Sequence, residues 1–191
     1  MRKITKTVSI HVLDFTELAS IEKELIGRAC EARLRAQAPY SNYWVGCALV
    51  TKNGIVMEGC NVENVNWSET VHAEENAISS TVAKLGPFSI SAMAVVGAPA
   101  NAEVVWPPNG ERKLSPIQNV GDVCPSCGHC LQCIAENCFG ADGKYDPSVV
   151  MLGYSQRTGE IYRTTIGDAF PMPFLPQHLG VNYALDARNK S

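Results

Sequence analysis

Hydrophobic and polar positions along the chain follow two periods in turn, that of a helix and that of a strand. From about Thr16 to Gln37, apolar residues recur every three or four positions, which indicates an amphipathic helix. Pro39 closes that helix. Two strand-like runs, Tyr43 to Thr51 and Ile55 to Cys60, flank an Asn-Gly step that is typical of a hairpin.

The remaining periodic segments complete an alternation of helices and strands. Further helices are predicted over Thr70 to Leu85, with Thr70 as N-cap, and from near Cys127 to about Asn137. Further strands are predicted at 8–12, 90–96, 149–154 and 160–165. This order predicts an α/β fold, a three-layer α/β/α sandwich with a mixed sheet. The chain length suits a single domain over residues 1–191.

One long stretch and the tail break the pattern. Residues 98–123 hold several prolines and glycines without periodicity. This composition predicts a long loop of the kind that is usually functional or mobile. The tail from Phe170 to Leu179 is rich in proline and is predicted to be irregular.

Composition and charge narrow the classes of function. A net charge of -3 and a pI near 5.8 argue against nucleic acid as a partner, because such proteins normally present a basic face. No apolar run approaches the roughly 18 residues of a membrane span, and the first twenty residues contain no signal-peptide core. We therefore expect a cytoplasmic protein with a small-molecule substrate and no membrane partner. In that reducing compartment, its 8 cysteines are expected to be thiols or metal ligands.

Two short stretches carry candidate chemistry. His72 and Glu74 lie two residues apart at one predicted helix start, and Cys127 and Cys130 lie one turn apart at another. The cysteine spacing matches a zinc-binding pair, and a helix N-terminus favours thiolate over thiol. Together the stretches have the H-x-E … C-x-x-C form of zinc deaminases that act on nucleobases.

The spacing of His72 and Glu74 restricts where a metal can lie. Within a helix, residues two apart diverge by roughly 200°, so both serve one site only if the metal lies beyond the helix end. The sequence therefore predicts two helix N-termini converging on one Zn²⁺ per chain. His72, Cys127 and Cys130 would be the ligands, with the fourth position left for water and Glu74 free to shuttle protons. A neutral histidine and two thiolates balance the charge of Zn²⁺ without a nearby cation, which suits Glu75 as the next residue.

The same residues allow other interpretations. A lone histidine on a helix is compatible with a structural role, and a lone C-x-x-C with a structural zinc half-site or buried thiols. Cys124, Cys127, Cys130 and Cys133 also approach the ferredoxin ligand run, although the last gap is one residue short and no proline follows. A catalytically silent zinc or iron–sulfur module is thus the non-enzyme alternative. Six cysteines are otherwise assigned to packing: Cys30, Cys47, Cys60, Cys124, Cys133 and Cys138.

Five motifs in order give the chain a resemblance to the cytidine deaminase family, in its free-nucleoside branch. The similarity extends from about Glu17 to Gly180. The motifs resemble the family's P-Y-S-x-F-x-V-G at 39–46, G-x-N-x-E-N at 59–64, H-A-E at 72–74, C-G-x-C-x-Q at 127–132 and F-G-P-x-x-L at 174–179.

The resemblance implies a reaction and a set of substrate contacts. The reaction is hydrolytic deamination of cytidine or deoxycytidine, in pyrimidine salvage, by a zinc-bound hydroxide with Glu74 as the catalytic acid and base. Asn61 and Glu63 are expected to hold the ribose, and Tyr43 to line the pocket near the base. The Ala73 backbone N–H is expected to bind the pyrimidine 2-carbonyl. Phe174 is expected to stack on the base, in many members in a neighbouring subunit's site, so a homo-oligomer, dimer or tetramer, is expected.

Three departures from the family pattern leave the exact substrate and the choice between dimer and tetramer open. Ser126 rather than proline directly precedes the first cysteine, with Pro125 one residue earlier. The 98–123 loop is longer than usual and contains Trp106-Pro107-Pro108. The histidine form of the zinc motif is typical of longer, duplicated dimeric members. The alternative substrate is therefore another amino-heterocycle, such as a modified nucleoside, a nucleotide or an aminonucleoside antibiotic.

Overall fold

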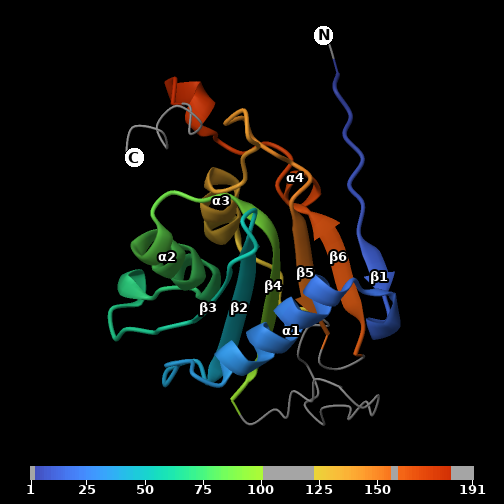
Figure 1. Ribbon diagram of the computed structural model, residues 1–191. Helices are drawn as coiled ribbons and strands as arrows, with labels where there is room; N and C mark the ends of the chain where they lie inside the picture. Colours follow the sequence, from blue (N-terminus) through green and yellow to red (C-terminus); the bar gives the residue numbers. More distant parts are fainter. Residues whose placement is uncertain (1–2, 101–122, 156–158, 182–191) are drawn as a thin grey trace.

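The computed structural model describes residues 3–100, 123–155 and 159–181 (Figure 1). A six-stranded sheet forms its centre, in the order β1-β6-β5-β4-β2-β3. Only β4 and β5 pair in parallel, and the other neighbours are antiparallel, so the sheet is mixed as predicted. The strands are β1 (His11–Leu13), β2 (Tyr43–Thr51), β3 (Val56–Cys60), β4 (Ile90–Pro99), β5 (Val150–Tyr154) and β6 (Ile161–Thr165).

Helices cover both faces of this sheet. Helix α1 (Ser20–Arg33) packs on one face, and α2 (Ala73–Leu85) and α3 (Gly128–Glu136) lie side by side on the other (Figure 1). Short helical turns complete the fold: α4 (Ile166–Ala169), η1 (Phe15–Glu17), η2 (Trp67–Glu69) and η3 (Pro176–Leu179). The three-layer α/β/α sandwich expected from the sequence is confirmed.

The central strand β4 shows why its sequence is apolar almost throughout. Met93 and Val95 belong to the core beneath α2 and α3, whereas Ala92, Ala94 and Val96 belong to the core beneath α1. A strand that is covered on both faces has no solvent side on which to place polar residues. Small residues on the α1 side allow that helix to approach closely.

The predicted N-cap of the second helix is wrong. Helix α2 begins at Ala73 and its N-cap is His72, while Thr70 ends the preceding turn η2. The reason lies in a contact distant in sequence. Val71 exchanges two backbone hydrogen bonds of 2.9 Å each with Val62, which hold Val71 extended and delay the helix by two residues.

Other element boundaries also differ from the sequence expectation. Strand β1 begins at His11 rather than residue 8, β4 continues to Pro99, and the short helix α4 was not predicted. Most of the predicted 98–123 loop, residues 101–122, lies outside the described residues, as does its Trp-Pro-Pro step. The single domain over residues 1–191 stays a prediction. Among the described residues, no helix is long and apolar enough to cross a membrane.

Candidate active site

The start of α2 places one metal ligand and one carboxylate at the helix end. His72 is the N-cap, with extended backbone (φ -76°, ψ 157°), and Glu74 lies in the first turn. The helix can lie against β3 because Gly59 has no side chain. A Cβ there would come within 2.3 Å of the Ala77 nitrogen and 2.6 Å of the Ala73 oxygen. The prediction that the metal lies beyond the end of this helix therefore rests on a defined local structure.

The start of α3 places two thiols in the same way. Cys127 is the N-cap and is exposed, whereas Cys130, one turn later, is fully buried. The Cys127 carbonyl accepts the first helical hydrogen bond from the Leu131 N–H at 2.9 Å. Positions three apart on a helix share one face, so both sulfurs point toward α2.

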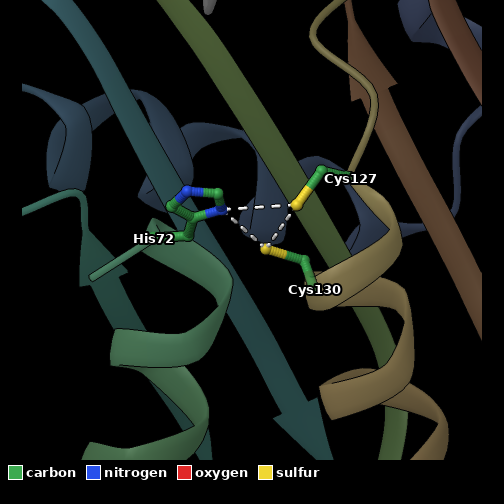
Figure 2. Close-up of side chains that lie close together, drawn as sticks. All are labelled: His72, Cys127 and Cys130. Atoms are coloured by element: carbon green, nitrogen blue, oxygen red, sulfur yellow. Dashed lines mark hydrogen bonds between the residues drawn. The ribbon is translucent and has the colours of Figure 1, made fainter. Parts of the chain in front are cut away.

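The two helix starts bring three donor atoms together (Figure 2). His72 Nδ1 lies 3.2 Å from Cys130 Sγ and 3.4 Å from Cys127 Sγ, and the two sulfurs lie 3.6 Å apart. A tetrahedral zinc with ordinary bond lengths separates nitrogen and sulfur ligands by about 3.6 Å and two sulfurs by about 3.8 Å. In the described parts of the chain, this is the one group of three metal-binding residues whose donor atoms all lie within 4.8 Å. The donor set and its spacing fit zinc.

The charge distribution around the donor atoms also matches a metal site. Burial raises the pKa of the Cys130 thiol, and the Glu74 carboxylate and Cys127 raise it further. The metal-free thiol is therefore protonated at neutral pH, and binding of a metal must displace that proton. Glu74 is 4% exposed and lies beside the triangle without belonging to it, the position expected of a proton shuttle.

Asn61 follows β3 and is tied to β2 by its side chain. Its amide Oδ1 accepts a hydrogen bond from the Val45 N–H at 2.9 Å, and its Nδ2 donates to the Tyr43 carbonyl at 3.0 Å. The residue is 8% exposed. The structure thus uses half of the hydrogen-bonding capacity of the amide to hold the start of β2.

Glu63 is anchored to the loop directly before β2. Its Oε2 accepts from the backbone N–H groups of Tyr40 at 2.9 Å and Ser41 at 3.2 Å. Desolvation raises the pKa of Glu63, but the hydrogen bonds from Ser41 and Tyr40 outweigh it, so the net shift is downward. Asn61 and Glu63 therefore face the same segment, as their spacing of two predicted.

Tyr43 meets a cysteine that the sequence had assigned to packing. Burial raises the pKa of Tyr43, and so do the charge and the hydrogen bond of Cys124. Burial likewise raises the pKa of the Cys124 thiol, and the Glu74 carboxylate adds to the effect. Cys124 thus lies against Tyr43 beside the expected base pocket. The only signal for it in the sequence is its position three residues before Cys127.

The remaining predicted residues divide into one buried and one exposed. Ala73 is 1% exposed, and as the first residue of α2 its N–H has no partner within the helix. Phe174 is 58% exposed, and its ring lies 5.6 Å from that of His178. Gln132 fixes its backbone, donating from Nε2 to the Phe174 carbonyl at 2.6 Å and accepting from its N–H at 3.2 Å. Gln132 thus joins the tail to α3.

A second interaction between the two ligand-bearing helices was not predicted. Glu75 Oε2 lies 3.4 Å from His129 Nε2. From the sequence, we expected Glu75 to contribute only to the charge balance of the zinc site. The residues between the two cysteines of a C-x-x-C motif give no signal for such a contact until α2 and α3 are placed side by side.

Comparison with known proteins agrees with this geometry. A family model, the cytidine and deoxycytidylate deaminase zinc-binding region, matches residues 19–141. The chain is 33% identical over 157 residues to a protein of Sporosarcina psychrophila named cytidine deaminase, covering 82% of this chain and 93% of that relative. A cytidine deaminase of Halalkalibacterium halodurans is 33% identical over 155 residues, covering 81% of this chain and 95% of that relative.

Solved structures resemble the fold as well. The crystal structure of cytidine deaminase from Burkholderia pseudomallei matches with a TM-score of 0.58 and 33% identity, covering 79% of this chain and 97% of that chain. That of cytidine deaminase from Mycobacterium leprae matches with a TM-score of 0.56 and 25% identity, covering 81% and 99%. The chain, with its His-Cys-Cys donor triangle, belongs to the cytidine and deoxycytidylate deaminase zinc-binding family.

Proposed function

We propose that this protein is a zinc-dependent hydrolase that converts cytidine or deoxycytidine to uridine or deoxyuridine and ammonia. The observation that carries the proposal is the donor triangle of His72, Cys127 and Cys130 with the buried Glu74 beside it. Relatives that share about a third of their residues with this chain over most of its length are named cytidine deaminase. The family membership and the site therefore support the same reaction.

The chain's own residues supply the binding of the metal and the movement of protons. His72, Cys127 and Cys130 would hold one Zn²⁺, which as a Lewis acid lowers the pKa of water and makes it a nucleophile at neutral pH. Glu74 would accept one proton from the attacking water and deliver it to N3 of the pyrimidine, and it would then take the second proton from the new C4 hydroxyl and pass it to the departing amine. Its burial beside the ligands keeps bulk water away from these transfers.

The sugar is bound by Asn61 and Glu63, which lie just beyond the end of β3. An amide carries two N–H groups and two acceptor lone pairs on its oxygen, and Asn61 uses one of each in its backbone bonds. One donor and one acceptor remain for a ribose hydroxyl. Glu63 uses Oε2 for the backbone, which leaves Oε1 to accept from a second hydroxyl. The backbone bonds then serve to orient both groups before the substrate arrives.

The base lies between these sugar contacts and the metal. The Ala73 N–H, next to the His72 ligand at the start of α2, donates to the 2-carbonyl of the pyrimidine. Tyr43 lines the pocket on the side of Cys124. The exposed ring of Phe174 stacks on the base bound in a neighbouring copy, so the protein works as a homo-oligomer, dimer or tetramer. Because its thiol ligands must stay reduced, we place it in the cytoplasm.

A substrate panel tests this function directly. Cytidine, deoxycytidine, their 5′-monophosphates and adenosine are each incubated with zinc-loaded protein, and the loss of ultraviolet absorbance and the release of ammonia are followed. We expect turnover of the two nucleosides and little of the monophosphates or adenosine. Turnover of the monophosphates alone would replace the nucleoside by a nucleotide, and a zinc-loaded protein inactive on all five would contradict the proposal.

A further inference from the structure

A second group of metal-binding side chains lies beside the donor triangle, on the same two helices. His129 and Cys133 belong to α3 and Glu75 belongs to α2. His129 Nε2 lies 3.4 Å from Glu75 Oε2 and 3.8 Å from Cys133 Sγ. One ring nitrogen therefore lies within 4 Å of both a carboxylate oxygen and a thiol sulfur. None of the three belongs to the triangle of His72, Cys127 and Cys130.

These two distances are those of ligands that share an ion. With ordinary zinc bond lengths, a tetrahedral ion separates a nitrogen and an oxygen ligand by about 3.4 Å, and a nitrogen and a sulfur by about 3.6 Å. The second group is wider than the first, because its three donor atoms do not all fall within 4.8 Å of one another. Closing it requires that Glu75 and Cys133, which both lie near His129, approach each other.

The local structure favours chelation by the pair on α3. Residues four apart on a helix lie on the same face, and two ligands at i and i+4 are the arrangement by which a single helix binds zinc. The His129 side chain is 61% exposed and that of Glu75 34%, so an ion has access from solvent. The His129 and His72 rings lie 6.2 Å apart, edge to face, which makes the second group a close neighbour of the first and separate from it.

We propose that Glu75, His129 and Cys133 form a second, weaker site for Zn²⁺ or a similar borderline divalent ion. The nitrogen, sulfur and oxygen donors suit such ions rather than Mg²⁺ or Ca²⁺, which prefer oxygen alone. A bound ion would join α2 to α3 at the outer side of the active site. The inference does not rest on the deaminase activity, because it concerns binding at residues outside the catalytic set.

A titration of the full chain with zinc tests the proposal. Protein that already holds one equivalent in the His72 site is titrated calorimetrically with further Zn²⁺, and with Co²⁺ as an optical probe of thiolate ligation. We expect one additional equivalent, with a cobalt-to-thiolate absorption band. His129→Gln, at an exposed position that does not threaten folding, is expected to remove this equivalent and keep the first. Glu75→Gln keeps an oxygen donor but removes its charge, and it is expected to weaken this equivalent by about 10-fold or more.

Two comparisons decide the outcome. Cys133→Ser should abolish the cobalt band while Cys60→Ser, which removes a partly exposed thiol elsewhere, should leave it unchanged. Cys130→Ser should remove the first equivalent and retain the second, so that a failure of the catalytic site is distinguished from a failure of the new one. A zinc-loaded wild type that binds no further metal, or an undiminished second equivalent in His129→Gln, would overturn the proposal.

Discussion

The metal-binding half and the sugar-binding half of the site are built in opposite ways. In the metal half, the three donor atoms of His72, Cys127 and Cys130 point at one another from two helix starts. In the sugar half, Asn61 and Glu63 already make hydrogen bonds to backbone groups of residues 40–45, the end of a loop and the start of β2. The donor atoms of the metal half need an ion as their partner, whereas the polar groups of the sugar half already have hydrogen-bond partners within the protein.

This difference predicts different consequences of mutation. Removing a metal ligand abolishes binding and chemistry, but it breaks none of the backbone bonds that hold the sheet and helices. Removing a sugar ligand leaves buried backbone groups without a partner, which costs about 1–3 kcal/mol for each group. Variants of the metal half should therefore separate function from fold, and variants of the sugar half should affect both.

The largest effect is expected from Cys130→Ser. Even the partners that orient metal ligands are worth about 10–100-fold in metal affinity, so loss of a ligand should exceed that and leave turnover below detection. Metal analysis of the dialysed variant measures the loss of bound zinc. Cys138→Ala, which removes an equally buried thiol (1% exposed, against 0% for Cys130), is the matched control and should keep one zinc. Full activity in Cys130→Ser would remove that thiol from the ligand set.

Glu74→Gln should lower kcat by about 10²–10⁴-fold, the usual contribution of a positioned acid and base. The amide keeps the shape of the carboxylate but cannot accept the proton, so zinc content and affinity for the nucleoside should stay close to those of the wild type. Steady-state kinetics with metal analysis on the same sample measures both. A kcat within about 3-fold of the wild type would contradict the assigned role.

Glu63→Gln should raise KM about 10-fold or more, because hydrogen bonds to a charged group contribute about 1.5–3 kcal/mol. Its exposed neighbour Glu69 offers the same chemical change as a control, and Glu69→Gln should leave KM unaltered. An unchanged KM in Glu63→Gln would remove Glu63 from the sugar site and leave it a purely structural role.

The pKa of Glu63 adds a test of the sugar half in stability. Desolvation opposes the shift, yet the hydrogen bonds lower the folded-state pKa overall. The stabilisation by the carboxylate is therefore complete above the unfolded pKa near 4.3 and is lost as the pH falls through the lower folded value. Unfolding measured by denaturant should show the wild type more stable than Glu63→Gln at pH 7, with the gap narrowing below about pH 4. A gap that widens on acidification would refute the anchoring described above.

The smallest effect is expected from Phe174→Ala, about 10-fold in kcat/KM, since stacking of a base on an aromatic ring is worth about 1–3 kcal/mol. Mixing this variant with Glu74→Gln should restore activity, because a mixed oligomer contains a site with an intact Glu74 and a neighbour's intact Phe174. Met172→Ala, at an even more exposed tail position, is the control. Absence of complementation in exchanged subunits would place Phe174 outside the neighbouring site.

The sequence predicted the parts of the site that depend on local geometry. The spacing of His72 and Glu74 predicted that both lie at a helix start, and the structure has His72 as the N-cap and Glu74 in the first turn. The spacing of Cys127 and Cys130 predicted a shared face, and their sulfurs lie 3.6 Å apart. The features that the sequence did not predict depend on contacts between residues distant in the chain. The true start of α2 follows from the bond between Val71 and Val62, which no local pattern reveals.

The neighbours of the site were missed for the same reason. Cys124 was assigned to packing because nothing nearby in the sequence indicates that Tyr43 lies against it. The contact of Glu75 with His129 depends on how α2 and α3 are placed on the sheet. The mixed sheet and its two covered faces were predictable from hydrophobic periodicity, whereas the pairings across the sheet face were not.

A reconstitution with zinc tests directly whether turnover of cytidine depends on one metal ion per chain. Metal-free protein is titrated with Zn²⁺ while the loss of ultraviolet absorbance of cytidine is followed, and bound zinc is measured in parallel. We expect no turnover without metal. The rate should rise linearly with added Zn²⁺ and stop rising at one equivalent per chain, even where further zinc binds. Turnover in the metal-free protein, or a fully zinc-loaded protein that leaves cytidine unchanged, would contradict it.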